Sequence, residues 1–330
     1  MYQTNRIQTT PRDRERGIAI VTVLLVVALA AALAASVVWR QLVAVRDVEN
    51  LRLNVETMWV ERAAVEWARA TIRAQSATSN VTYDGQPWSA PVKDVQLVDV
   101  LPHDTIAVNG DLANAWISGD VEDAQSRFNL LNLVSRPAPS QPWQINGDGL
   151  QAYRRLLGEL SLDPGLAQLT ASYILRSLGD GTAGGDWPMQ LVSAQDLARI
   201  PGYDAQVVQT LAPFITILPN LTTVNANTAA ESTLVAAIPT LSGTQARMLT
   251  ERRSTGYFIS SADIAEVLFG ATTNAQLPTG AIVDVNSGYF IVHCRIHSGK
   301  LNTRIDTLIA RYGIGEFSWT AVIWVHRLAG

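Results

Sequence analysis

Three residues near the C-terminus carry side chains capable of chemistry. His293, Cys294 and His297 supply two imidazoles and the only thiol of the chain. Such a set could bind a metal ion or hold an activated nucleophile. The neighbouring residues predict a strand, however, and on a strand residues 293 and 297 face one way while residue 294 faces the other. We interpret Cys294 as a small buried thiol between two ordinary strand histidines. We find no convincing catalytic set elsewhere and expect the protein not to be an enzyme.

The composition of the chain limits which partners it can bind and which interactions can stabilise its fold. One cysteine among 330 residues cannot form an intramolecular disulfide, so stability must come from core packing. The whole chain has 25 basic and 29 acidic residues. Without residues 1–17, which hold four arginines and two acids, the balance is 21 against 27, a net charge of −6. This balance does not favour binding to nucleic acid.

The segment that organises the rest of the chain is apolar and lies near the N-terminus. Ile18 to Trp39 is a run of 22 residues in which only Thr22 and Ser36 add polar side chains to the Trp39 indole. As a helix it would be about 33 Å long, enough for a hydrocarbon core of roughly 30 Å. Four arginines precede it, so the positive-inside rule keeps the leader in the cytoplasm and the rest of the chain outside.

Three interpretations of this segment stay open. Ala32-Leu33-Ala34 is similar to a signal-peptide cleavage site, although the apolar run is longer than a usual signal core of roughly 7–15 residues. An ordinary membrane anchor is the second interpretation. The third rests on the sequence RGIAIVTVLLVVALAAALAASVVWRQ, which resembles the class III leader of pilins and pseudopilins. This resemblance implies cleavage between Gly17 and Ile18 by a prepilin peptidase and methylation of the new amine of Ile18.

The fifth residue after that cleavage point departs from the usual pattern. Most pilins and pseudopilins have Glu there, whereas this chain has Thr22. The K-type minor pseudopilin of type II secretion also lacks this Glu. A carboxylate at that depth can neutralise the terminal amine of a neighbouring subunit, and an unpaired charge within the membrane is costly. A subunit at the filament tip has no neighbour above it to neutralise, so Thr22 indicates a tip position.

Residues 40–75 continue as a helix, because they lack Gly and Pro and place apolar residues at helical spacing. The apolar positions are Ala44, Val48, Leu51, Val55, Met58, Val65 and Ile72. A loop rich in turn formers follows, then strand-like pieces at 95–101, 106–108 and 114–117. Residues 122–133 (EDAQSRFNLLNL) come next. They closely resemble the E-D-x-x-x-R-F-N-L-N-x-L signature that K-type pseudopilins carry where the sheet gives way to inserted helices.

The region after the signature predicts helices from about residue 146 to residue 270. It contains a weak repeat, in which Leu197–Pro201 with Leu211 matches Val235–Pro239 with Leu249. Each half predicts a helix, a short turn and a helix, similar to helix-hairpin-helix or SAM-like units. The second half also resembles competence-type DNA receptors, and a membrane-anchored periplasmic DNA receptor is therefore the rival function. Against it, residues 143–276 contain no lysine, which leaves scattered arginines such as Arg247, Arg252 and Arg253 to neutralise phosphates.

The C-terminal section predicts a meander of three antiparallel strands. The strands are expected at Tyr289–His297, Thr303–Tyr312 and Ser318–Arg327, with turns between them. The predicted fold class is α+β: a pilin-like long N-terminal helix packed on an antiparallel sheet, with a large inserted all-α (SAM-like or helix-hairpin-helix) domain. The expected segments are a leader at 1–17, a helix at 18–75 that is transmembrane to about 39, the first part of the α/β domain at 76–142, the inserted helices at 143–276, and strands at 277–330.

The resemblance also implies a metal. K-type pseudopilins bind calcium through acidic residues of the helical insertion, and at the corresponding place this chain offers Asp180 and Asp186. Calcium usually takes six to eight oxygen ligands, so these two carboxylates would be only part of a site.

The function implied by the resemblance is that of a minor pseudopilin which caps the tip of the type II secretion pseudopilus and initiates its assembly. The implied location is the inner membrane, crossed once, with a periplasmic C-terminal domain. The implied partners are the I-, J- and H-type minor pseudopilins, the major G-type pseudopilin and the prepilin peptidase. The outer-membrane secretin and secreted substrates are further implied contacts, and no nucleic acid is expected.

Overall fold

The structure is a computed structural model that describes residues 12–100, 114–179, 187–270, 275–298, 302–313 and 315–329. It divides into two units, the first ending at Val60 and the second beginning at Glu61. One continuous helix, α1 (Arg12–Thr78), contributes to both. The predicted helix over residues 40–75 is therefore confirmed.

The first unit contains the N-terminal part of α1. Its segment Ile20–Glu49 is long and apolar enough to cross a membrane. The large apolar side chains in this segment are more than two-fifths exposed, and those from Ile20 to Val38 more than half. A helix with apolar side chains exposed on all sides is typical of a lipid environment. Further along, Val48, Leu51, Val55 and Met58 are at least half exposed.

The second unit begins with the last part of α1, which packs on a sheet. Ala68 and Ile72 are fully or almost fully buried, and Val65 is partly buried against the same core. Two arginines tie the helix to the last strand: Arg327 Nη2 lies 2.7 Å from Glu61 Oε2, and Arg69 Nη2 donates to the carbonyl of Thr320 at 2.7 Å. The sheet therefore covers only one side of α1.

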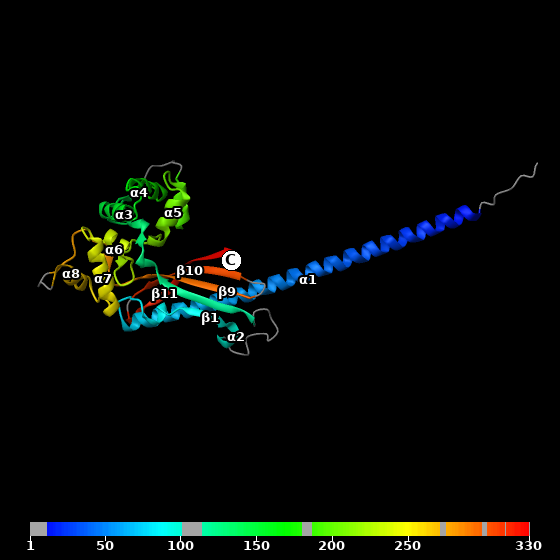
Figure 1. Cartoon of the computed structure of the whole chain (residues 1–330), viewed down its shortest axis with the longest axis horizontal. Helices are drawn as coiled ribbons and strands as arrows, with labels where there is room; N and C mark the ends of the chain where they lie inside the picture. The colour runs from blue at the N-terminus through cyan, green and yellow to red at the C-terminus, as the bar shows by residue number, and fades with distance from the viewer. Residues whose placement is uncertain are drawn as a thin grey trace, which may run out of the picture. The chain divides into compact units, whose positions relative to one another are not determined.

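The sheet has five strands in the order β1-β2-β9-β10-β11, and all neighbours are antiparallel. The strands are β1 Val92–Gln96, β2 Trp116–Asp123, β9 Tyr289–His297, β10 Asn302–Tyr312 and β11 Trp319–Ala329. Figure 1 shows the last part of α1 running along this sheet, and the predicted C-terminal meander is confirmed. Two strands from before the helices thus join three from after them.

The strand predicted at 95–101 is only partly correct. After β1 the chain forms a single helical turn, α2 (Leu97–Val100), instead of continuing as a strand. Leu97 at its start is buried, and its N–H still donates to the carbonyl of Ala115. The piece predicted at 114–117 becomes the start of β2. The piece predicted at 106–108 lies outside the described residues.

The two faces of the sheet bury different partners. On one face Val121, Phe290 and Ile309 pack with Ile72 of α1. On the other face Ile291, Leu308 and their neighbours pack with Leu218, which comes from the helical region. This alternation follows the two-residue period of a strand.

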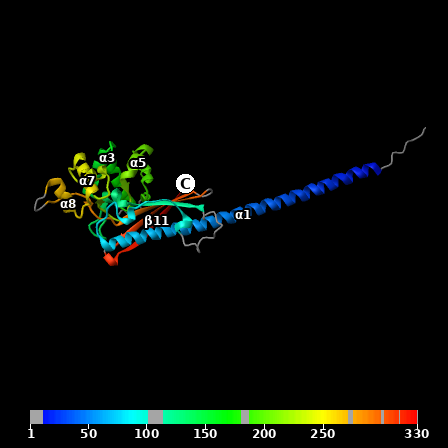
Figure 2. The same cartoon turned by 60° about the horizontal axis from the view of Figure 1, so that its bottom comes forward.

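The residues between β2 and β9 form most of the helices. These are α3 Gly147–Glu159, α4 Leu166–Ser177, α5 Ala205–Leu211, α6 Glu231–Ala237, α7 Gly243–Thr255 and α8 Ser261–Phe269. Short 3₁₀ helices are η1 Pro87–Ser89, η3 Ala124–Ser126, η4 Leu130–Leu133, η5 Ala194–Arg199, η6 Ala212–Phe214 and η7 Gly315–Phe317. Figure 2 shows that the helices α3, α5, α7 and α8 gather at one end of the sheet.

Two apolar cores and three short strand pairs hold this region together. One core is built mainly on α3, α4 and α5, and the other on α6, α7 and α8. The strand pairs are β3 Phe128–Asn129 with β6 Ile215–Thr216, β4 Val134–Ser135 with β5 Gln144–Ile145, and β7 Val224–Asn225 with β8 Val283–Asp284. The first and last pairs are parallel and join residues far apart in the chain.

The predicted repeat forms two helix-turn-helix segments with a shared turn conformation. Gly202 follows Pro201 with φ +96°, and Thr240 follows Pro239 with φ +63°. The left-handed region suits glycine, so Thr240 is strained where its counterpart is not. The first helix of the first segment is the 3₁₀ helix η5 rather than an α-helix. The SAM-like classification stays a prediction.

Candidate functional site at the junction of sheet and helices

The signature residue Asp123 ends β2 and forms the centre of a buried polar junction. Its Oδ1 accepts a hydrogen bond from the N–H of Gln125 at 2.8 Å, which caps η3. Its Oδ2 accepts from Asn225 Nδ2 at 2.8 Å, Thr228 Oγ1 at 2.6 Å and Ser287 Oγ at 2.7 Å. One carboxylate therefore links β2, the segment that follows β7, and the segment that leads into β9.

In this junction, burial and polar contacts shift the pKa values of the ionisable groups in opposite directions. Burial raises the pKa of Asp123, and the four hydrogen bonds oppose that rise. Arg311 of β10 lies nearby, and its Nη2 donates to Thr82 Oγ1 at 3.0 Å and to the carbonyl of Ser287. Burial lowers the pKa of Arg311, while the Asp123 charge raises it. The junction thus sets the buried Asp123 carboxyl group beside the partly buried Arg311 guanidinium.

Two asparagines of the signature connect it to the residues after η6. Asn129 Oδ1 accepts from the N–H of Leu218 at 3.1 Å, and its Nδ2 donates to the carbonyl of Asn220 at 2.7 Å. Asn132 accepts from the N–H of Thr222 and donates to the carbonyl of the same residue. Each side chain thus bonds to the backbone of a segment about 90 residues away. Asn129 Oδ1 also accepts from the N–H of Leu131 at 3.1 Å and so caps η4.

A second polar segment, Asn225–Ala229 (NANTA), is held from its other side by Arg253. The Nη1 atom of Arg253 donates to the carbonyls of Ala226 at 3.0 Å and Ala229 at 2.6 Å. Burial lowers the pKa of Arg253, and nearby carboxylates raise it. The rival DNA-receptor interpretation requires arginines such as Arg253 to neutralise phosphate. Because the guanidinium of Arg253 donates to these two carbonyls, it is poorly placed to do so.

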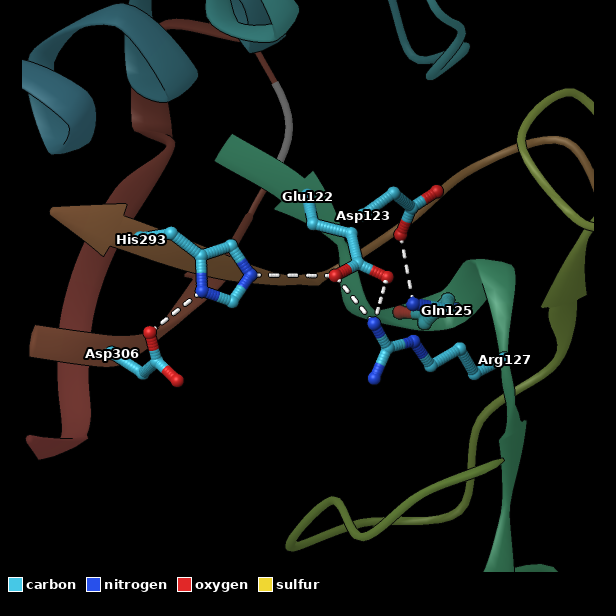
Figure 3. Close-up of polar contacts among 6 residues, drawn as sticks. All are labelled: Glu122, Asp123, Gln125, Arg127, His293 and Asp306. Carbon is cyan, nitrogen blue, oxygen red and sulfur yellow. Dashed lines mark hydrogen bonds and ion pairs between the residues drawn. The ribbon is translucent and has the colours of Figure 1, made fainter. Parts of the chain in front are cut away.

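Beside Asp123, the preceding residue Glu122 faces the opposite way and forms a surface charge cluster (Figure 3). Arg127 Nη2 lies 2.6 Å from the Glu122 carboxylate, and His293 Nε2 lies 3.4 Å from it. His293 Nδ1 lies 2.7 Å from Asp306 Oδ1. Burial lowers the pKa of His293, but its bonds to Glu122 and Asp306 outweigh this effect and raise it. Burial likewise opposes ionisation of Glu122, while His293 and Arg127 bring its pKa below the usual value.

The structure separates the three residues considered for chemistry. His293 faces the charge cluster, whereas Cys294 is buried and unbonded to another cysteine. Burial, with a contribution from Glu61, raises the pKa of Cys294 to about 12. A thiol with such a pKa is not an active nucleophile near neutral pH. The interpretation of Cys294 as a buried structural thiol is consistent with this environment.

The other predicted site residues are the two at the processing point and the two proposed as calcium ligands. Gly17 and Ile18 lie within α1. Asp180 and Asp186 lie outside the described residues, so the calcium prediction remains one. Among the residues that are described, no group of three His, Cys, Asp or Glu side chains is placed to hold a metal ion.

Comparison with known proteins finds relatives that share the region of the signature. A sequence model of the family described as "Type II secretion system (T2SS), protein K" matches residues 126–220, from inside the signature to Asn220. The chain is 27% identical to type II secretion system protein K of Pseudomonas aeruginosa, over 87% of this chain and 86% of that protein. Protein K of Klebsiella pneumoniae is also 27% identical, over 91% of this chain and 94% of that protein. The predicted family is confirmed.

A solved structure extends this relationship to the fold. A chain of the GspK-GspI-GspJ complex from the enterotoxigenic Escherichia coli type 2 secretion system matches with a TM-score of 0.61. The match covers 85% of this chain and 99% of that one, at 16% sequence identity. The predicted α+β fold class is thereby confirmed. The chain is related to a minor pseudopilin of type II secretion, a structural component of the system.

The K-family relationship also shows what the sequence analysis missed. Thr82, Ser287 and Arg311 contribute to the Asp123 junction but carry no motif of their own. The one sequence signal was a second polar segment, residues 225–229 (NANTA), which lies within the helical insertion and far along the chain from the signature at 122–133. Buried polar groups need partners, so two such motifs could have been predicted to meet.

Proposed function

We propose that this protein is a minor pseudopilin that caps the tip of the type II secretion pseudopilus and initiates its assembly. The observation that carries the proposal is the match to protein K over most of both chains, which includes the signature and the helical insertion. The apolar segment Ile20–Glu49 supports a single membrane crossing, which we assign to the inner membrane with the second unit in the periplasm.

The proposed mechanism is mechanical and involves no catalysis. A prepilin peptidase would cut between Gly17 and Ile18 and methylate Ile18, which frees α1 to pack with the helices of other subunits. The proposed partners are the I- and J-type minor pseudopilins, by analogy with the GspK-GspI-GspJ complex, followed by the H-type and major G-type subunits. The helices gathered at one end of the sheet would prevent another subunit from stacking there, which supports a position at the tip (Figure 1). Contacts with the secretin and with secreted proteins would follow from that position.

The test is co-expression of the full chain with the I- and J-type minor pseudopilins of the same organism. We expect the three proteins to co-purify in detergent and the mature chain to begin at methylated Ile18. An intact leader, an N-terminus near Ser36, or purification of the chain alone would contradict the proposal. Gel shifts with duplex DNA at moderate salt address the rival receptor function, for which tight, salt-sensitive binding is the required result.

Calcium binding by Asp180 and Asp186 is a separate part of the proposal. Isothermal titration of the purified chain with calcium is expected to release or absorb heat and to raise the melting temperature. No heat and no change in melting would end the idea.

A further inference from the structure

The last strand of the sheet has an outer edge that pairs with no other strand in the part of the chain that the structure describes. In the order β1-β2-β9-β10-β11, β11 is terminal, and ten of its 11 residues pair with β10. A terminal strand presents backbone N–H and C=O groups that can pair with another strand. We call the outward side of residues 320–327 the β11 edge.

The register identifies which backbone groups point outward. The N–H of Arg311 donates to the carbonyl of Gly288 at 2.7 Å, so the backbone of Arg311 faces β9 rather than β11. Its partner Thr320 must then point away from β10. This agrees with the bond from Arg69 Nη2 to the Thr320 carbonyl, which covers that end of the β11 edge.

The backbone groups of successive β10 residues face β9 and β11 in turn. The outward-facing residues of β11 can therefore be assigned past an irregularity at Ile323. The register passes from Val322 opposite Ile309 to Trp324 opposite Leu308, which leaves Ile323 as an extra residue. The backbones of Val322, Val325 and Arg327 therefore point outward. Within the described part of the chain, none of these three forms a backbone hydrogen bond outside its own sheet.

An apolar cavity opens beside the same strand. It has a volume of about 240 Å³ and is lined by side chains from η4, α4 and β11, including Leu131, Trp143, Ile174, Val192, Ile323 and Trp324. Small-molecule sites are usually larger, roughly 300–1,000 Å³. A cavity of this size next to a free edge instead suits an apolar side chain projecting from an added strand, since alternate side chains of a paired strand reach pockets on one face.

We infer that the β11 edge receives an extended strand from a partner minor pseudopilin, which places an apolar side chain in this cavity. The inference rests on the proposed function. The recognised chemistry is an extended strand with apolar residues at alternate positions. Main-chain hydrogen bonds would supply affinity and the cavity would supply specificity.

A second copy of this chain does not fit as the occupant. Along α1, Glu61 precedes Arg69, but their partners on β11 are Arg327 and Thr320, so α1 and β11 run in opposite directions. Symmetric antiparallel pairing of two β11 edges would point the two α1 segments in opposite directions. The two chains would then reach Glu61 from opposite ends of the paired sheets, which does not suit two chains anchored in one membrane.

The experiment uses the full chain co-expressed with the I- and J-type minor pseudopilins. Val325→Pro removes an outward N–H without removing a bond to β10, and proline is tolerated at such edge positions. The matched control Val325→Thr keeps the N–H and the branched side chain. We expect Val325→Pro to reduce recovery of the complex at least about tenfold while the variant chain melts within a few degrees of wild type, and Val325→Thr to behave as wild type.

Two further measurements keep the inference testable if Val325→Pro does not fold. Val192→Trp fills the cavity from an exposed position and is expected to reduce recovery similarly, with Val192→Thr as its control. Hydrogen exchange of the wild-type peptide covering residues 320–328 is expected to slow at least about tenfold on complex formation.

The outcomes separate the two proposals. Failure of wild-type chains to co-purify would overturn the proposed function together with this inference. Wild-type recovery with Val325→Pro and with Val192→Trp, and unchanged exchange at residues 320–328, would overturn the inference alone. Protection of the β11 edge only when a secreted protein is added, and not in the complex, would also overturn it.

Discussion

The Nδ2 atom of Asn225 donates a hydrogen bond to Asp123 Oδ2 at 2.8 Å, although 102 residues separate them in the chain. Both side chains are buried, with 0% and 2% of their surface exposed. One residue ends a strand of the sheet and the other precedes the second group of helices. This bond therefore ties the end of β2 to the segment between the two groups of helices.

Replacement of Asp123 tests this coupling. Asp123→Asn is expected to lower the free energy of unfolding by about 2–4 kcal/mol, because an amide has one acceptor oxygen and leaves buried donors without partners at roughly 1–3 kcal/mol each. The measurement is urea unfolding of the full chain in detergent, followed by tryptophan fluorescence. Asp120→Asn, at an exposed position of the same strand, is the control and should change stability by less than about 0.5 kcal/mol. Equal unfolding midpoints for both variants would contradict the assigned role.

Two glycines of α3 give a second matched pair. A Cβ on Gly149 would lie 1.9 Å from the carbonyl oxygen of Asn132, whereas one on Gly158 would meet nothing within 4 Å. Gly149→Ala is therefore expected to destabilise the protein by about 2 kcal/mol or more, since backbone must move. Gly158→Ala is expected to stabilise it by about 0.5–1 kcal/mol, because alanine favours the helix. Thermal unfolding of both variants checks the contrast, and a shift of the same sign for both would argue against the close approach of α3 to the signature.

The charge cluster on the sheet predicts a dependence on pH. The pKa of His293 is raised above 6.5, so its contribution to stability is complete below that pH and is lost as pH rises through the folded-state value. The pKa of Glu122 is lowered from 4.5, so its contribution is present above that pH and is lost as pH falls through the folded-state value. Both contributions to stability are therefore present together between pH 4.5 and 6.5.

The variant His293→Gln tests how much this charge cluster contributes to the stability of the protein. It should destabilise the protein by roughly 1 kcal/mol more at about pH 5.5 than at about pH 8.5. The groups that face His293 are Glu122, Asp306 and Asp120, and Arg127 and Arg304 lie beside the first two. Melting temperatures at both pH values provide the measurement. An equal loss at the two pH values would show that the histidine acts only through packing.

Arg253 should matter for stability rather than for binding. Arg253→Met is expected to cost about 2–3 kcal/mol, because it removes two hydrogen bonds from a charged donor and leaves the carbonyls of Ala226 and Ala229 without it. Arg247→Met is the control, since Arg247 is exposed and lies 3.8 Å from Glu231. Urea unfolding distinguishes the two, and similar stability of both variants would contradict the prediction. DNA gel shifts of both variants should match those of wild type.

The sequence alone determined the features that depend on local pattern. The apolar run and helical spacing predicted α1, alternation predicted the meander from Tyr289, and the signature at 122–133 predicted the family. Local physics suffices there, because helix and strand periods and turn residues are written in consecutive residues. The same pattern was wrong after Gln96, where residues 97–100 form a helical turn in place of the expected strand.

Only the tertiary structure decided which distant groups meet. Asp123, Asn225, Ser287 and Arg311 are spread over most of the second unit, and nothing in their spacing states that one carboxylate joins them. Likewise, the sequence predicted β11 but not that it would be terminal in the sheet or beside a cavity. Long-range pairing depends on the summed burial of both faces of the sheet, which no single segment encodes.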